Sequence, residues 1–353
     1  MSFKSNSSSE NGILEQFFEK ASKYNLPLVT TFEITENCNL KCKHCYNFDR
    51  IEKKFQKSNN YLNKDKILNT IEELALAGAM YLNFTGGEAL LHPHLFEFIK
   101  KAREFNLEVR LKTNGILLTE EICQKLSDLD VAGLDISLYG YSENSYLAIT
   151  GVKNSFQKAI EGIAIAKKFN FDIAVSVIIH KLNFHELESM INYCKERQLR
   201  ANFSTEMTER YDGTFGAKNF EITIEQFESG LIGKFSDIFM INKTENSFQC
   251  SCAKTVCGIN SKGEVFPCIG APIPSGNLQS QSFKEIWEKS EVLNNIRNLK
   301  NEDFKSCVNC NVAKFCNRSS GAIYVNTKNY TGCDESTLLQ AQSRKNFFEN
   351  FMN

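Results

Sequence analysis

Short apolar runs alternate with longer amphipathic segments between residues 28 and 204 of this 353-residue chain. The apolar runs are typical of buried parallel strands, and the longer segments carry apolar residues at helical spacing. Strands are expected at 28–34, 81–85, 108–113, 131–138, 172–179 and 199–204, and helices at 63–78, 94–106, 119–129, 155–169 and 184–197. Such alternation predicts parallel strands joined by right-handed crossovers. The prediction is therefore an α/β fold, a partial (β/α)6 TIM-like barrel two units short of a closed one, with its chemistry at the C-terminal ends of the strands.

Charge and cysteine content narrow the class of protein. Lys and Arg number 41 against 42 Asp and Glu, so no basic excess predicts binding to nucleic acid or to anionic lipid. No run approaches the roughly 18 apolar residues of a membrane span, and the polar N-terminus does not resemble a signal peptide. Thirteen cysteines are an odd number for a disulfide framework. We therefore expect a cytoplasmic protein with reduced thiols and no nucleic-acid or membrane partner.

Three cysteines, Cys38, Cys42 and Cys45, follow the first expected strand with the spacing C-x3-C-x2-C. Three thiolates on one loop can hold an iron–sulfur cluster from a single side. Because a 4Fe-4S cluster has four irons, one iron is then left open to a small molecule. The alternative is a zinc site completed by His44 or by a remote residue. Zinc knuckles usually pair two C-x2-C units, whereas this loop has one, so the sequence favours the cluster.

Glycines and polar residues lie at the ends of later strands. The second strand runs into Thr85-Gly86-Gly87-Glu88, where two glycines let the backbone approach a ligand and Glu88 offers an acceptor for an ammonium group. The third strand ends at Asn114, the fourth ends near Ser137, and Ser176 lies on the fifth. C-terminal ends of parallel strands meet at one face of a barrel. These residues are therefore expected around one cavity with the cysteine triplet.

Eight further cysteines lie within ninety residues after the alternation stops near residue 245. They are Cys250, Cys252, Cys257, Cys268, Cys307, Cys310, Cys316 and Cys333. Eight thiols can ligate two more clusters, four each, or two structural zinc ions. Their place after a cluster-binding barrel favours iron–sulfur.

The triplet and the Gly-Gly-Glu sequence resemble those of the radical S-adenosylmethionine (SAM) enzymes. The resemblance implies that SAM binds the open iron of a 4Fe-4S cluster through its amino and carboxylate groups. One electron would then cleave the sulfonium and release a 5′-deoxyadenosyl radical. In that family Gly86-Gly87-Glu88 would hold the amino group, Tyr46 would lie near the adenine, and Asn114 and Ser137 would contact the ribose or the carboxylate.

The C-terminal cysteines resemble a SPASM domain, which binds two auxiliary 4Fe-4S clusters. Cys250 or Cys252 with Gly263 and Cys268 fits the first half of the pattern, and Cys257 lies between them. The implied ligands of the second auxiliary cluster are Cys307, Cys310, Cys316 and Cys333.

One position departs from that pattern, because Ser320 stands where a further cysteine normally ligates the first auxiliary cluster. Either the extra thiol of the Cys250-x-Cys252 pair supplies the fourth ligand, or one iron stays open and could bind a substrate thiolate.

Most radical SAM enzymes with SPASM domains modify peptides or proteins, and Asp212-Gly213-Thr214 is similar to loops in maturases that form thioethers. The resemblance thus implies a thioether cross-link in a ribosomal, cysteine-containing peptide, with flavodoxin or ferredoxin as reductant. The nearest rival is a sulfatase-maturing enzyme, although those have an Asp where this chain has Ile269. Other rivals are carbon–carbon cross-linking, epimerisation, haem-precursor decarboxylation and a non-enzymatic metal scaffold.

Three regions are expected along the chain. They are an N-terminal tail and short helix at 1–27, the partial barrel at 28–240, and the cysteine-rich domain at 241–353.

Overall fold

The computed structural model describes residues 10–48, 60–241, 243 and 248–351. The first nine residues of the expected tail lie outside this range. The expected short helix is present as α1 (Glu10–Lys23), which begins three residues earlier than its apolar pattern indicated.

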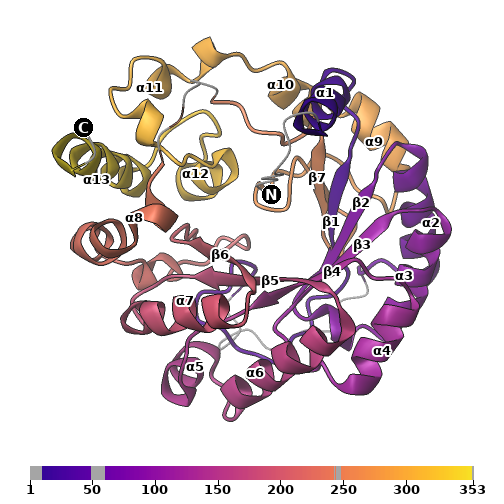
Figure 1. Cartoon of the computed structure of the whole chain (residues 1–353). Coiled ribbons are helices and arrows are strands. Elements are labelled where there is room, and N and C mark those ends of the chain that lie inside the picture. Colours follow the sequence, from indigo (N-terminus) through magenta and orange to yellow (C-terminus); the bar gives the residue numbers. More distant parts are fainter. Residues whose placement is uncertain (1–9, 49–59, 242, 244–247, 352–353) are drawn as a thin grey trace.

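One eight-stranded sheet forms the framework of the molecule (Figure 1). Its strands are β1 (Val29–Glu33), β2 (Tyr81–Thr85), β3 (Glu108–Thr113), β4 (Gly133–Ser137), β5 (Asp172–Ile178), β6 (Arg200–Ser204), β7 (Val256–Ile259) and β8 (Val265–Phe266). The spatial order is β6-β5-β4-β3-β2-β1-β7-β8, and each pair is parallel except β7 with β8. The expected partial barrel of six parallel strands is confirmed.

The helices follow the strands and cover the outside of the sheet (Figure 1). After α1 they are α2 (Lys64–Leu76), α3 (Leu95–Glu104), α4 (Glu120–Asp128), α5 (Glu143–Thr150), α6 (Ser155–Ala166), α7 (Leu187–Glu196), α8 (Gly233–Phe239), α9 (Phe283–Lys289), α10 (Glu291–Arg297), α11 (Lys305–Val308), α12 (Ser320–Thr327) and α13 (Glu335–Phe351). Local signals set several ends. The side chain of Asn63 caps α2 by accepting from Lys66 N at 2.9 Å, and Gly78 follows its C-terminus at φ +96°.

Alternate residues of the strands face opposite environments. Leu82, Phe84, Leu134 and Ile136 are fully buried in the core shared with the covering helices. The opposite face of β3 and β4 is polar and paired, since Asp135 accepts from Lys112 Nζ at 2.7 Å and from Arg110 Nη2 at 3.2 Å. Because side chains alternate along a strand, the same strands carry both the core and a polar barrel interior.

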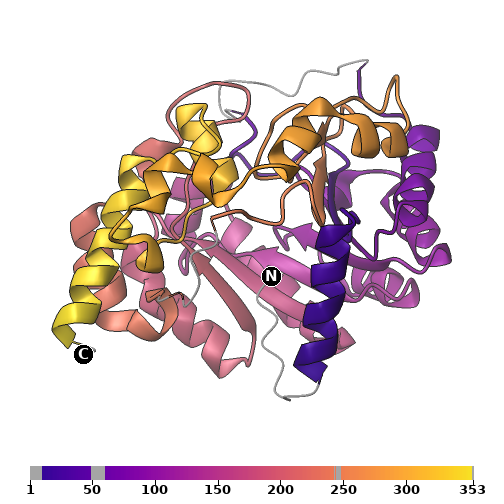
Figure 2. The ribbon, with the colours of Figure 1, turned by 90° about the horizontal axis from the view of Figure 1, so that it is seen from above.

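The C-terminal region spans the open side of the partial barrel. At one edge β7 pairs with β1, and Trp287 Nε1 of α9 donates to Asn25 O at 2.6 Å. At the other edge Gln340 and Ser343 of α13 bond Thr205 and Glu228. Figures 1 and 2 show these orange and yellow segments closing the ring between β7 and α8. The expected boundary at residue 240 stays a prediction, and the sheet continues across it through β7.

No helix in the described part of the chain is both long and apolar enough to cross a membrane.

Two leucines of α2 offer a matched test of the packing. Leu74 is fully buried and Leu76 is 77% exposed, although they are two residues apart on one helix. We expect Leu74→Ala to lower the free energy of unfolding by about 2–5 kcal/mol, because it leaves a cavity in the core. Leu76→Ala should change it by less than about 0.5 kcal/mol. Urea denaturation followed by circular dichroism checks both, and equal losses would contradict the packing described.

Candidate active site

A cavity of about 310 Å³ lies at the C-terminal ends of the barrel strands. This volume is within the range of small-molecule sites. Of the residues expected there, it is lined by Cys38, Cys42, Cys45, Tyr46, Gly86, Gly87, Asn114 and Ser137. The structure therefore brings together residues that lie up to 99 positions apart in the chain, at the face of the barrel where the fold predicts chemistry.

The cysteine loop is held by a helix that the sequence pattern did not predict. Lys41 N donates to Thr150 O at 2.8 Å and Lys43 N donates to Ile149 O at 3.0 Å, both at the C-terminus of α5. The three thiols of the loop are free of disulfides. His44 between them is buried, and burial lowers the pKa of its imidazole to about 4. The loop thus presents thiols beside a neutral histidine.

The Gly-Gly segment lies directly against the backbone that leads into the cysteine loop. Gly87 N donates to Thr35 O and Glu88 N donates to Asn37 O, each at 2.7 Å. A Cβ on Gly86 would lie 2.3 Å from Thr35 O, and one on Gly87 would lie 2.1 Å from Asn37 O. Glycine is therefore required at both positions by contact with backbone, and the two loops form one wall of the cavity.

Glu88 has a different place from the one expected. Its carboxylate is 1% exposed and accepts from Thr113 Oγ1 and Asn114 N at 2.8 Å each, and from Leu90 N at 3.2 Å. Burial raises the pKa of this carboxyl, against the effect of the three donors. The side chain is not part of the cavity wall. Glu88 therefore supports the end of β3, and its predicted contact with an ammonium group stays a prediction.

Of the other expected residues, Asn114 and Ser137 line the cavity and Ser176 does not. Asn114 lines the cavity and donates from Nδ2 to Asn39 Oδ1 at 2.7 Å, which ties β3 to the cysteine loop. Ser137 lines the cavity as well. Ser176 pairs in register with Ser137 but is outside the lining, where Ile178 takes the place on β5. Ser176 lies two residues before Ile178 on the strand, and its assignment to the site stays a prediction.

A loop after β6 supplies the part of the wall that sequence reasoning missed. Glu206, Met207, Thr208 and Tyr211 line the cavity. Tyr211 N donates to Tyr46 O at 2.7 Å, and the two tyrosine rings lie 4.9 Å apart. Tyr46 Oη in turn donates to Glu33 Oε1 at 2.6 Å. The nearest signal in the sequence was Asp212-Gly213-Thr214, which follows these residues directly.

Glu206 is notable in this loop because it faces two cavities. It lines the cavity described above and a second one between β6 and the C-terminal region. Burial raises the pKa of its carboxyl, which hydrogen-bonds Ser319.

Three of the four cysteines expected in the first C-terminal group lie together. They are Cys250, Cys252 and Cys268. Cys252 contacts Cys250 and Cys268, and Tyr330 Oη lies 3.3 Å from Cys250 Sγ. Hydrogen bonds from Cys252, Tyr330 and Ser320 lower the pKa of the Cys250 thiol. Ser320 therefore occupies the position beside these thiols where the SPASM pattern has a cysteine.

Cys257 is placed elsewhere. It lies on β7, fully buried in the core, with Sγ 3.2 Å from Thr30 Oγ1 of β1. Its assignment as a cluster ligand stays a prediction.

The second group is complete. Cys307, Cys310, Cys316 and Cys333 surround one small cavity of about 40 Å³ with Lys243 and Arg318. No group of three His, Cys, Asp or Glu side chains placed to hold a single metal ion is found among the described residues. Arg318 also donates to Ser320 Oγ at 2.6 Å and thereby links the two groups. Its guanidinium is suited to offset the negative charge of thiolates.

Comparisons with known proteins follow this geometry. The sequence model of the Radical SAM superfamily matches residues 32–194, and that of the SPASM iron–sulfur cluster-binding domain matches residues 250–311. The chain is a radical SAM enzyme with a C-terminal SPASM domain. Radical SAM enzymes of this architecture use SAM, a 4Fe-4S cluster and auxiliary iron–sulfur clusters bound by the SPASM domain.

Two curated relatives cover most of this radical SAM enzyme. The AdoMet-dependent heme synthase of Methanosarcina barkeri is 27% identical over 87% of this chain and 95% of its own length. The PqqA peptide cyclase of Bradyrhizobium diazoefficiens is 26% identical over 84% of this chain and 82% of its own length.

Two solved structures share the fold of the radical SAM enzyme. Native anSMEcpe with bound AdoMet superposes with a TM-score of 0.69 at 17% identity, covering 92% of this chain and 96% of that one. Streptococcus suis SuiB bound to its precursor peptide SuiA gives a TM-score of 0.63 at 15% identity, covering 96% and 82%.

The residues present fit these cofactors. Three thiols converge with a Gly-Gly backbone on one cavity, and four more thiols surround a second space lined by basic side chains. We propose that Cys38, Cys42 and Cys45 hold the SAM-cleaving cluster and that Cys307, Cys310, Cys316 and Cys333 hold an auxiliary one. A second auxiliary cluster at Cys250, Cys252 and Cys268 is part of the same proposal.

Gly87 offers a test of the cavity wall. Gly87→Ala should raise the dissociation constant for SAM by at least about tenfold, because its Cβ must displace the Asn37 backbone. Gly12→Ala is the control, since a Cβ there meets nothing within 4 Å. Isothermal titration with SAM under anoxic conditions measures both. Unchanged affinity in Gly87→Ala would remove this segment from the site.

Iron content tests the second cysteine group. Cys310→Ala should lose about four irons per chain after anoxic reconstitution, because its thiol is one of four around the space. Cys194→Ala should keep its iron, since Cys194 is a core residue on α7 whose thiol pKa is raised to about 11 by burial. Iron and sulfide analysis reports both numbers, and equal iron in the two variants would count against an auxiliary cluster at this group.

Proposed function

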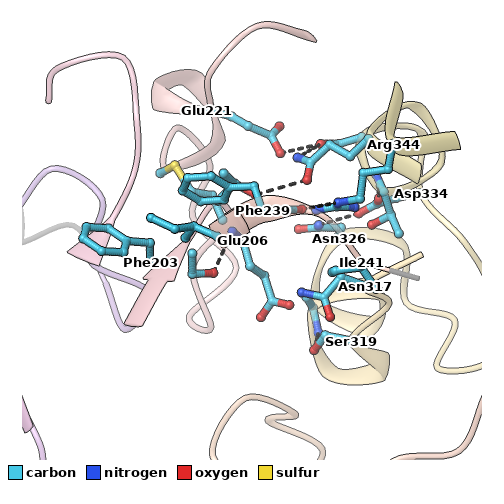
Figure 3. Close-up of a pocket in the computed structure, with 18 residues that line it drawn as sticks. Phe203, Glu206, Glu221, Phe239, Ile241, Asn317, Ser319, Asn326, Asp334 and Arg344 are labelled. Atoms are coloured by element: carbon cyan, nitrogen blue, oxygen red, sulfur yellow. Dashed lines mark hydrogen bonds between the residues drawn. The ribbon is translucent and has the colours of Figure 1, made fainter. Parts of the chain in front are cut away.

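We propose that this radical SAM enzyme modifies a peptide by removing a hydrogen atom from one of its residues. The observation that carries the proposal is the second cavity at the junction of β6 with the C-terminal region (Figure 3). It shares Glu206 and Met207 with the cavity of the cysteine triplet. An adjoining space of this kind lets a chain reach the reacting centre from the side.

The second cavity has the chemistry that a peptide backbone requires. Its wall carries amides, hydroxyls and carboxylates from three separate elements, among them Ser204, Asn317, Ser319, Asn326 and Gln340. Such side chains can both donate to peptide carbonyls and accept from peptide N–H groups. A flat, apolar ligand would leave many of these groups without a partner, at a cost in free energy.

The relatives support the same class of substrate. SuiB has been solved with the precursor peptide SuiA, and anSMEcpe with the Cp18Cys peptide. The curated relatives include a PqqA peptide cyclase and the mycofactocin maturase MftC of Mycolicibacterium smegmatis. None of these names describes a thioether, so the cross-link expected from the sequence is left as one outcome among several peptide modifications.

The residues of this chain have defined tasks in the proposed reaction. When bound, SAM and its cluster supply one-electron chemistry that abstracts hydrogen. The cysteine loop and Gly86-Gly87 place that chemistry at one end of the joined cavities, while the wall around Glu206 positions the peptide. Tyr46 and Tyr211 pack across the loops and limit access of water to the site.

Decarboxylation of a haem precursor is the second candidate, because a heme synthase is 27% identical over 87% of this chain. The charge of the site argues against it. A porphyrin with several carboxylates would have to approach Glu206, which forms no ion pair among the described residues, beside Glu221 and Asp334, whose two charges one lysine, Lys218, offsets only in part. Like charges in a partly desolvated space repel, so a peptide is the better match.

Mass spectrometry separates these outcomes. The enzyme is co-expressed with short peptide genes found beside its own gene in ordinary medium, and the same peptides are also treated with the purified enzyme in D₂O. A cross-link should lower the peptide mass by about 2 Da, since two hydrogens are lost, whereas epimerisation should add deuterium from solvent. Cys42→Ala is the control and should leave the peptide unchanged, because it removes a triplet thiol. Decarboxylation of a porphyrin with no change in any peptide would overturn the proposal.

A further inference from the structure

We propose that the carboxylate of Glu206 binds a basic side chain of the peptide substrate, close to the residue that is modified. The inference rests on the proposed function and adds to it the kind of peptide that the enzyme selects.

Three cavities form a path from the surface to the cysteine triplet. An outer cavity of about 500 Å³ is bordered by the loop that contains Phe215 and by α13. It shares Glu221, Asn326 and Asp334 with the cavity of Figure 3, which in turn shares Glu206 with the cavity of the triplet. Because they share lining residues, the three cavities lie next to one another in series. An extended peptide that advances about 3.3 Å per residue can follow them inward.

The outer end of this path has apolar side chains that the chain itself does not cover. Phe215 is 82% exposed, Leu339 is 43% exposed and Ile224 is 37% exposed, and all three line the outer cavity. Exposed apolar side chains gathered at one groove are typical of an interaction site. This is the place where a peptide would first make contact.

Negative charge exceeds positive charge along the path. Glu221 and Asp334, which line both the outer cavity and the cavity of Figure 3, lie near Lys218, whose Nζ is 3.5 Å and 4.0 Å from their carboxylates. Arg344 donates to the backbone oxygens of Phe239 and Phe315, and Lys112 in the cavity of the triplet pairs with Asp135. All three cations of the linings are therefore engaged elsewhere.

Glu206 is the acidic residue of these linings that also borders the cavity of the triplet. Among the described residues, no Lys, Arg or His forms an ion pair with it, and its recorded side-chain partner is the Ser319 hydroxyl. Figure 3 shows its carboxylate directed away from β6, toward Asn317 and Ser319 on the C-terminal region. Glu206 is an exposed side chain that faces both cavities. A bound peptide would remove its carboxylate from solvent, which is costly unless a cation or several donors meet it. A lysine or arginine of the substrate satisfies this requirement.

The position of Glu206 gives the interaction a role in selection. It lines both the second cavity and the cavity of the triplet, so a basic group bound there lies within a few residues of the reacting position. Removing or reversing the charge of one partner in a pair that the bound peptide shields from solvent weakens binding more than the same change at an exposed rim.

Selection from a displayed peptide library tests the inference without relying on turnover. The probe is a pool of 12-residue peptides with one fixed cysteine and random residues elsewhere, passed over the immobilised, reconstituted enzyme with SAM. Peptides retained by the unmodified enzyme should be enriched in Lys or Arg at a constant distance from the cysteine. Glu206→Gln should reduce that enrichment by about tenfold, and Glu206→Lys should shift it to Asp and Glu.

A control variant and a fold check accompany the selection. Glu225→Gln changes an exposed glutamate next to the outer cavity that lines none of the three spaces, and it should retain the basic preference. SAM affinity and iron content are measured for each variant, so that a misfolded protein is recognised.

The outcomes distinguish the inference from the proposed function. Retained peptides with no basic preference, or with the same preference after Glu206→Gln, would overturn the role of Glu206 and leave peptide modification standing. No retention above enzyme-free beads would overturn both the peptide substrate and the inference.

Discussion

The close contact between two backbone segments is the constraint on which this site depends. Gly86 and Gly87 lie against Thr35 and Asn37 so closely that no side chain fits between them. Two hydrogen bonds of 2.7 Å join the segments, and they connect the end of β2 to the start of the cysteine loop. Glu88 then extends the same connection to β3 through Thr113 and Asn114. Three strand ends are thereby fixed around one cavity by glycine contacts and by a buried carboxylate.

A partial barrel leaves one side open, and the C-terminal region uses that opening. Through β7 it continues the sheet from β1, and through α13 it packs near β6, so it spans both edges. The cysteine groups of the SPASM domain are thus placed beside the cavity of the triplet, and Gly270, just after Cys268, lines that cavity directly. The space that remains between the barrel and this region is where the second cavity lies. The closure of the barrel and the path for a substrate are therefore one structural feature.

Serine in place of a cysteine changes the first auxiliary group in a specific way. Ser320 Oγ accepts from Arg318 and lies beside Cys250, and Tyr330 Oη approaches the same thiol at 3.3 Å. The group therefore offers three thiols surrounded by hydrogen-bond donors. Cys257, the remaining thiol of this region, is fully buried on β7 with its Sγ 3.2 Å from Thr30 Oγ1.

Local patterns in the sequence determined the six barrel strands, the helices that cover them apart from α5, the cysteine triplet and the group at Cys307, Cys310, Cys316 and Cys333. Alternating burial and the spacing of ligands on one loop are properties of neighbouring residues, so they can be recognised without a structure. The tertiary structure alone decided which other residues join the site. Thr30 and Cys257 meet across 227 positions, and Glu206 faces Ser319 from a distant part of the chain. Such meetings depend on how the C-terminal region closes the barrel, which no local periodicity encodes.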